Sequence, residues 1–342
     1  MPTDVRTFSS MRSRAALCLV LVGGGACRGS CDPAASTPDA DVDTVIEAGA
    51  PDAQKNPWPT AEETKVKCPE VLVSARKDGA IANKYVVPTA ADRAVFRDAV
   101  ALLLRRGADG QKEAGAKVEP LGFVVEALPE VPDALVIREQ DGKKRGGGAY
   151  VIRVNETNKL VVETPHTFYD EGTFPLGYDF FVRTHARAWF LNTVHRYKGA
   201  PAGADGVHPS DVAHAPDSFF QAATEGAVDA LPSLTVVQLH GFAEREAGGR
   251  AVISTGEKAK GNVLLEKMKT ALEGAAGAPI LRYPDDSKEL GATTNVQGTV
   301  VRNAKGRFFH MEMSESLRRE LLVSEPLRNR TWSAIAQGLE LP

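Results

Sequence analysis

The segment from Leu234 to Leu239 constrains the fold most, because it is a near-continuous apolar run that ends at His240. A strand that is apolar on both sides is expected to be buried on both faces, as in a parallel sheet covered by helices. Segments of helical and strand-like periodicity alternate around it, which is typical of layered α/β proteins. The sequence therefore predicts an α/β layer fold with one central sheet.

The remaining elements follow from hydrophobic periodicity and turn residues. Further strands are expected over residues 122–128, 134–138, 149–154, 159–163, 279–283 and 306–313. Helices are expected over residues 90–105, with Thr89 as the cap, and over 178–197, 258–273 and 315–323. The strands 149–154 and 159–163 are predicted to form a hairpin or to be consecutive strands.

The N-terminus predicts export. An apolar run over residues 15–22 is followed by small residues up to Cys27, and the basic residues before it are Arg6, Arg12 and Arg14. This pattern indicates a signal peptide over residues 1–27, too short to span a bilayer as a stable helix. The small residues before Cys27 also resemble a bacterial lipobox, although Gly24 stands where leucine is usual. We expect a periplasmic or outer-membrane-associated lipoprotein, or a secreted protein.

Residues 28–64 are rich in Ala, Pro, Asp and Thr, which predicts a flexible tether. The folded domain is then expected over residues 65–342, with 65–148 either supplying the first strands or forming an accessory portion. The cysteines are at positions 18, 27, 31 and 68, so none is a nucleophile or metal ligand of the main domain. Cys31 and Cys68 form a disulfide or remain unpaired thiols; the sequence leaves both open.

The balance of charge gives no reason to expect a nucleic-acid partner. The formal net charge is −3, without the basic face or tail that such a partner requires. The expected partner is a small-molecule or peptide substrate. Contact with a membrane is expected only through a lipid anchor at the N-terminus.

The first candidate site element is a strand that runs into a loop carrying His166 and Glu171. Open α/β sheets bind ligands outside the carboxyl ends of their strands, so a site is expected there. Imidazole and carboxylate are natural ligands of Zn²⁺. Asp170 is an alternative ligand that we rank below Glu171.

The second element is His240, at the end of the apolar strand and followed by Gly241. A catalytic zinc site commonly has three protein ligands and leaves a position for water. His166, Glu171 and His240 would supply these ligands. Taken separately, each histidine is also consistent with a satisfied core or capping residue.

The third element is Glu312, which lies within the apolar strand 306–313 just before a helix. An ionised carboxylate in a buried strand is costly unless it is paired or functional. A carboxylate beside a metal serves as general base and acid in hydrolysis. The alternative is a salt bridge between Glu312 and Arg318 or another arginine.

Taken in order, these motifs resemble the zinc carboxypeptidase-like superfamily. They are a strand-end His-x4-Glu-Gly-Thr, a later Leu-His-Gly and a final Met-Glu-Met-Ser-x-x-Leu-Arg. The resemblance covers roughly residues 145–325 and is nearest to poly-γ-glutamate hydrolases and N-formylglutamate amidohydrolases. It implies a mixed central sheet flanked by helices, zinc bound by His166, Glu171 and His240, and Glu312 as general base and acid. The Thr-Phe-Tyr after His166 departs from the glycine-rich run frequent in those hydrolases.

Several other polar residues are candidates for substrate binding: Arg187, Asn192, Arg196, His214 and Asn295. Arginine pairs bidentately with carboxylates, so Arg187 or Arg196 is suited to an acidic substrate group. Salt-bridged helix faces and ordered turns are the alternatives. Ser218 is either a helix cap or, in a third and weaker hypothesis, the nucleophile of a serine hydrolase, although no Gly-x-Ser-x-Gly motif accompanies it.

The leading hypothesis is an exported zinc-dependent hydrolase of amide or peptide bonds, acting on substrates that carry a carboxylate. The carboxylate preference rests on family analogy and on the arginines. The alternative is a non-catalytic surface lipoprotein that binds a ligand on the same fold.

Overall fold

The structure is a computed structural model that describes residues 58–60, 63–79, 85–245 and 249–341. The predicted signal peptide 1–27, the lipobox cysteine Cys27, Cys31 and most of the predicted tether 28–64 lie outside the described residues. No helix in the described part of the chain is long and apolar enough to cross a membrane.

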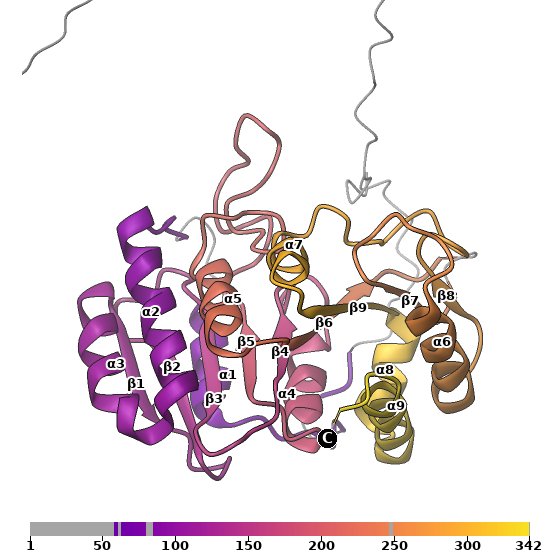
Figure 1. Cartoon of the computed structure of the whole chain (residues 1–342), viewed down its shortest axis with the longest axis horizontal. Coiled ribbons are helices and arrows are strands. Elements are labelled where there is room, and N and C mark those ends of the chain that lie inside the picture. Colours follow the sequence, from indigo (N-terminus) through magenta and orange to yellow (C-terminus); the bar gives the residue numbers. More distant parts are fainter. Residues whose placement is uncertain (1–57, 61–62, 80–84, 246–248, 342) are drawn as a thin grey trace, which may run out of the picture. The chain divides into compact units, whose positions relative to one another are not determined.

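Helices cover a sheet of nine strands formed by the described residues (Figure 1). The strands are β1 Phe123–Ala127, β2 Ala134–Glu139, β3 Ala149–Arg153, β4 Leu160–Thr164, β5 Ala188–Leu191, β6 Thr235–Phe242, β7 Ala251–Ser254, β8 Ile280–Arg282 and β9 Arg307–Ser314. The α-helices are α1 Glu70–Gly79, α2 Ala90–Arg106, α3 Gln111–Val118, α4 Thr173–Arg183, α5 Phe219–Ala230, α6 Val263–Ala276, α7 Val296–Asn303, α8 Glu315–Val323 and α9 Glu325–Gly338.

The sheet is mixed, with the strand order β1-β2-β3-β5-β4-β6-β9-β7-β8. Its centre, β5-β4-β6-β9, is parallel throughout. The strands β1, β2 and β3 join one side of this centre in antiparallel fashion, and β7 pairs antiparallel with β9 on the other. The mixed central sheet flanked by helices that the sequence predicted is confirmed, and the carboxyl ends of β4, β6 and β9 share one edge.

Two apolar layers hold the helices against the two faces of the sheet. One core contains side chains of α1, α4, α6, α8 and α9, and the other contains side chains of α2, α3, α5 and α7. The strand β4 shows why both layers form: Val162 belongs to the first core and Val161 to the second. Successive strand residues point to opposite faces, so an apolar run buries both.

The segment predicted as a helix over residues 178–197 is two elements, and that prediction is wrong in its second half. The helix α4 ends at Arg183, and His185 has φ of 48°, in the left-handed region that interrupts a helix. The chain then forms β5, which lies between β3 and β4 in the sheet. Of the two arrangements predicted for β3 and β4, consecutive strands is confirmed and the hairpin is not formed, because β5 lies between them.

The N-terminal described residues join the same domain. The predicted cap at Thr89 is confirmed, because its side chain accepts a hydrogen bond from the Asp92 amide at 3.1 Å. The strands β1 and β2 extend the central sheet, so residues 123–139 supply strands to it. Trp58, within the segment predicted as a tether, is partly buried against the core cluster that contains α4 and α8.

Candidate metal centre and active site

One face of the sheet changes from apolar to polar toward the carboxyl ends of β6 and β9. Val236 and Phe308 pack in the core that contains α5 and α7. The next residues on that face are Gln238 and His240 of β6 and His310 and Glu312 of β9. The two strands pair in parallel register with His240 opposite Glu312, which places imidazole and carboxylate side by side.

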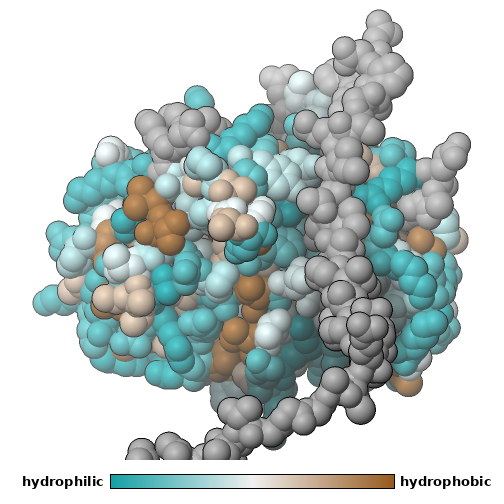
Figure 2. All heavy atoms as spheres, turned by 90° about the horizontal axis from the view of Figure 1, so that it is seen from above, coloured by the Kyte–Doolittle hydropathy of each residue, from teal (hydrophilic) through white to brown (hydrophobic). Residues whose placement is uncertain are grey.

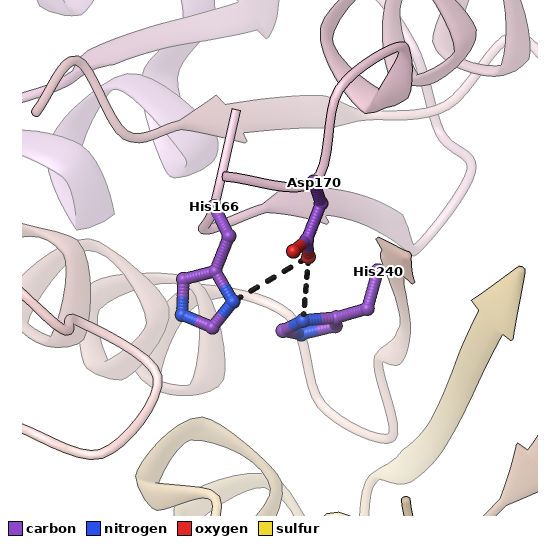
Figure 3. A group of neighbouring side chains, drawn as sticks. All are labelled: His166, Asp170 and His240. Carbon is purple, nitrogen blue, oxygen red and sulfur yellow. Dashed lines mark ion pairs between the residues drawn. The ribbon is translucent and has the colours of Figure 1, made fainter. Parts of the chain in front are cut away.

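The loop after β4 brings a second imidazole and another carboxylate to the same point (Figure 3). His166 follows the strand by two residues, and the Asp170 amide donates to the His166 carbonyl at 2.8 Å, which folds the loop back. Asp170 Oδ2 lies 3.5 Å from His166 Nδ1 and 3.2 Å from His240 Nδ1. The three side chains are buried, with exposed fractions of 1%, 2% and 4% for His166, Asp170 and His240.

Hydrogen bonds behind the rings fix which nitrogen of each histidine carries its proton. His166 Nε2 lies 2.8 Å from Asp211 Oδ1, and a carboxylate only accepts, so Nε2 is the donor. His240 Nε2 lies 2.8 Å from Gln238 Oε1, which also only accepts. In its neutral form each ring therefore presents the lone pair of Nδ1 to Asp170. Arg196 Nη1 lies 3.4 Å from His166 Nδ1, which is consistent with that lone pair.

Gln238 is itself held in one orientation by a buried network. Its Nε2 donates to Glu163 Oε2 at 2.8 Å, and its Oε1 also accepts from Asn295 Nδ2 at 2.7 Å. Thr224 donates to the other oxygen of Glu163 at 2.6 Å. Because the amide nitrogen must face the carboxylate, the amide oxygen must face His240.

Asp170 Oδ2 is a buried oxygen without a hydrogen-bond partner among the described residues. It faces two ring lone pairs, an arrangement that is repulsive unless a cation lies between them. Two neutral imidazoles and one carboxylate, each ring oriented by a partner on its other nitrogen, match the donor set of a zinc site. These residues fit a divalent metal.

The electrostatics favour a neutral His240 ring and an ionised Asp170 carboxylate. Burial lowers the pKa of His240 to about 4 against the opposing effect of Asp170, so the ring is neutral at neutral pH. Burial raises the pKa of the Asp170 carboxyl, but His166 and His240, where they donate to it as protonated rings, outweigh burial and hold that pKa well below its usual range. Metal binding requires neutral imidazole and ionised carboxylate.

The structure does not bring Glu171, the predicted third ligand, to the histidines. Its side chain is exposed and lines two surface cavities, whereas its neighbour Asp170 points between the rings. The turn that follows His166 decides this choice, because it directs consecutive side chains to opposite sides. The structure therefore places Asp170, which the sequence ranked second, in the position expected of Glu171.

Glu312 lies beside this centre and reaches the surface. Its Oε1 is 3.9 Å from His240 Nδ1 and 3.6 Å from His310 Nε2. It lines a cleft of about 400 Å³ that also contains Asp170 and Arg318. The alternative prediction is a salt bridge from Glu312 to Arg318 or another arginine; the hydrogen bonds of Arg318 itself go to the carbonyls of Met313 and Phe242, at 2.8 and 3.4 Å.

A void of about 10 Å³ lies beside His166 and His240, close to the size needed for one water molecule or ion. Its lining includes His166, His240, His310 and Glu312. His310 and Glu312 form a second possible ligand group with His240, and Asp211 and His214 form a third with His166. Each of the three groups contains at least one of the two histidines that the sequence singled out.

Two of the predicted substrate-binding residues hold the backbone instead. Arg187 precedes β5 and so lies at the opposite edge of the sheet from His166, where it donates to the carbonyls of Leu104 and Glu156. The amide of Asn192 donates to the carbonyls of Pro165 and Val194, at 2.8 and 3.1 Å. It thereby fixes the loop that carries His166.

The other three predicted residues surround the centre. Arg196 forms a buried ion pair with Asp211 at 2.6 Å, and His214 Nδ1 lies 3.2 Å from the same carboxylate. Asn295 caps α7 and orients Gln238. All three contact groups that position the ligands. The sequence did not single out Asp211 and Gln238, the residues that these three contact. For Gln238 the only signal is the spacing of two residues between it and His240 along β6.

Ser218 is the N-cap of α5. Its hydroxyl accepts from the Gln221 amide at 3.0 Å, and the side chain is fully buried. This arrangement matches the capping hypothesis. The structure shows no histidine contact for this hydroxyl among the described residues.

Neither a protein-family model nor a curated protein sequence matches the chain. Among solved structures it is similar to an N-formylglutamate amidohydrolase from Ralstonia eutropha JMP134, at 11% identity over 57% of this chain and 97% of that chain, with a TM-score of 0.37. It is also similar to a metallo-carboxypeptidase from Burkholderia cenocepacia, at 11% identity over 67% and 69% of the two chains and a TM-score of 0.37.

An aspartoacylase family protein from Mesorhizobium loti is similar at 12% identity over 64% of this chain and 71% of that chain, with a TM-score of 0.38. At these identities and TM-scores the likeness adds nothing about the substrate of this chain.

Proposed function

We propose that this protein is a zinc-dependent hydrolase of amide or peptide bonds, with His166, Asp170 and His240 as the metal ligands. The observation that carries the proposal is the buried Asp170 Oδ2, which lacks a hydrogen-bond partner among the described residues and faces two Nδ1 lone pairs. A bound cation satisfies all three atoms at once.

Zinc, when bound, lowers the pKa of water and polarises a carbonyl oxygen. The chain supplies the proton transfers. Glu312 is buried to an exposed fraction of 8% but opens to the cleft, so its carboxylate can accept a proton from the attacking water. It then returns this proton to the nitrogen of the departing amine. His310, 3.6 Å from Glu312, orients the carboxylate.

Arg318 is suited to hold a carboxylate of the substrate in the same cleft. Its guanidinium is almost fully buried, its Nε has no hydrogen-bond partner, and it forms no ion pair within the described part of the chain. Gly241 makes this position possible, because a Cβ there would lie 1.4 Å from Arg318 Nη1. By contrast, Arg196 is committed to Asp211 and Arg245 to Glu289. An anionic substrate group would stabilise the unpaired guanidinium.

We place this activity outside the cytoplasm on the basis of the signal-like N-terminal sequence. Fractionation of cells that express the full chain would test the location. Loss of export in a chain without residues 1–27 is expected. Processing before Cys27 with lipid attachment would distinguish a lipoprotein from a secreted protein.

The proposed function is tested by metal content and by hydrolysis together. The purified protein should hold one zinc ion, and Glu312→Gln should retain it while hydrolysis of N-acylated amino acids and acidic peptides falls by roughly 10²–10⁴-fold. Purified protein that takes up no zinc would exclude the metal site. Zinc binding with unchanged hydrolysis in Glu312→Gln would exclude the role of that residue, and zinc binding without any hydrolysis would favour a binding protein.

The neighbouring carboxylates provide a matched pair for the ligand assignment. Asp170→Asn and Glu171→Gln each remove one charge at adjacent positions. We expect zinc affinity to fall only in Asp170→Asn. A loss confined to Glu171→Gln would restore the assignment that the sequence favoured.

A further inference from the structure

A second cavity adjoins the metal cleft and has no part in the chemistry described above. It has a volume of about 1070 Å³, and the cleft and the cavity share Trp58 and Glu171 in their linings. Its apolar walls include Val73 of α1, Phe174 of α4 and Leu322 of α8. A ligand that leaves the cleft past Glu171 would enter this space.

The cavity contains a cation whose charge is not paired. Arg76, in the last turn of α1, donates from Nη2 to the Thr167 carbonyl at 2.7 Å, and this is its one hydrogen bond within the described residues. Its Nε is buried without a partner, and none of the described carboxylates forms an ion pair with it. The guanidinium lies 4.2 Å above the ring of Phe168 and 5.4 Å from the ring centre of Phe174, which fixes its plane.

The charge of the lining favours an anion. Arg76, Lys65 and Lys67 line the cavity against two carboxylates, Glu70 and Glu171. A guanidinium with spare donors on an aromatic face is preorganised for a carboxylate, which it binds through charge-assisted hydrogen bonds. The apolar walls beside it suit the aliphatic part of the same ligand.

We propose that this cavity is a second substrate subsite, in which Arg76 binds a carboxylate of an extended acidic peptide while another part of the chain lies at the metal. The inference rests on the proposed function, because it interprets the ligand as an extension of that substrate. The Thr167 carbonyl joins Arg76 to the residue after His166, so the subsite and the metal ligand share one loop. The substrate class is thereby narrowed to peptides with carboxylates on more than one residue.

Binding can be measured without hydrolysis, by calorimetry on the full chain kept metal-free with a chelator. The probes are N-acetyl-triglutamate, chosen to extend from the metal cleft into the cavity, and N-acetylglutamate, chosen to occupy the metal cleft alone. We expect Arg76→Gln to lower the affinity for the tripeptide by roughly ten- to a hundredfold. The affinity for N-acetylglutamate should change by no more than about twofold. Arg330→Gln, the same charge change at an exposed position of α9, should change neither.

Val73→Trp gives a second test that leaves the charge unchanged. It should fill part of the cavity and weaken only the tripeptide, provided that its melting temperature shows a folded protein. The proposal is overturned if the wild type does not prefer the tripeptide, or if both folded variants bind it as the wild type does. Equal weakening of both probes in Arg76→Gln would also overturn it.

The two proposals fail in different ways. If the wild type hydrolyses no substrate but Arg76→Gln selectively weakens the tripeptide, the subsite stands without the hydrolase. If hydrolysis depends on zinc and Glu312 but Arg76→Gln leaves the tripeptide unaffected, only the subsite is wrong.

Discussion

The two histidines of the candidate metal centre are supported by different kinds of neighbour. Behind His166, Nε2 donates to the carboxylate of Asp211, whose charge is balanced by the buried guanidinium of Arg196 at 2.6 Å. Behind His240, Nε2 donates to the neutral amide of Gln238. Both rings are oriented by a hydrogen bond at the same ring atom, so geometry alone does not distinguish them.

The difference lies in charge. A carboxylate partner fixes the ring and also raises its basicity as a ligand, whereas an amide fixes only the ring and its tautomer. Behind the His166 ring the negative charge is that of Asp211, whereas behind the His240 ring the carboxylate of Glu163 acts only through Gln238. The centre therefore has one electrostatically supported ligand and one that is supported mainly by orientation.

Removing either ring completely should cost a similar amount of zinc affinity, despite the different support behind the two. His166→Ala and His240→Ala should each lower zinc affinity on the order of a thousandfold, because each removes one of three protein ligands. Competition with a chromophoric chelator measures this loss. The control is His185→Asn, at an exposed position before β5 and so at the opposite edge of the sheet from His166 and His240. Retention of zinc in either alanine variant would remove that ring from the site.

The support of His240 should make stability depend on pH through Glu163. Burial raises the pKa of this carboxyl to about 7, against the hydrogen bonds from Thr224 and Gln238 that lower it. A raised pKa in the folded state gives stability that is present below the unfolded value of about 4.5 and is lost as the pH rises through about 7.

Relative to Glu163→Gln, the wild type should therefore lose about 3 kcal/mol of unfolding free energy between pH 4 and pH 8. Urea denaturation of the metal-free proteins over that range measures the difference. The amide has no charge to desolvate, so the variant gains in relative stability as the pH rises. A difference that is constant with pH would show that Glu163 is ionised normally in the folded protein.

The carboxylate support of His166 should matter more for zinc than the amide support of His240. Asp211→Asn should lower zinc affinity by about 50-fold, because it removes the charge behind the ring and leaves Arg196 unbalanced. The matched control is Asp217→Asn, which makes the same change in an exposed ion pair with Arg93. An unchanged zinc affinity in Asp211→Asn would mean that its charge has no effect on the ligand.

The smallest of these effects on zinc is expected from the amide. Gln238→Leu should lower zinc affinity about tenfold, because His240 loses the acceptor that selects its tautomer while the charge near the metal is unchanged. Nitrogen chemical shifts of His240 in the folded variant should show a mixture of tautomers. If Gln238→Leu weakens zinc binding as much as Asp211→Asn does, the orientation of the ring and not the charge behind it determines the zinc affinity at both His166 and His240.

Much of the fold could be predicted because periodicity is a local property. The helix over residues 90–105 and the strands near 134–138, 159–163 and 306–313 are found within a residue or two of their predicted bounds. The prediction of one helix over residues 178–197 is wrong because only part of the segment has apolar residues at helical spacing. Burial between β3 and β4 selects a strand for Ala188–Leu191.

The choice between Asp170 and Glu171 shows where prediction of the site ended. Two adjacent carboxylates after a histidine are equivalent as sequence, and only the turn after β4 decides which of them faces His240. Asp211 is similar, since it lies 45 residues from His166 and is brought there by tertiary folding. Such contacts between distant residues depend on how the chain connects its strands and helices, which local periodicity does not reveal.

By itself the sequence determined the strand ends, because alternation of apolar residues fixes where a strand is buried and which polar residue follows it. Those ends placed His166, His240 and Glu312 as candidates. Only the tertiary structure decided the third carboxylate, the partners of each ring and the cavity around Arg76. These depend on parallel register and on loop geometry, which bring together residues that are remote in sequence and direct individual atoms toward one point.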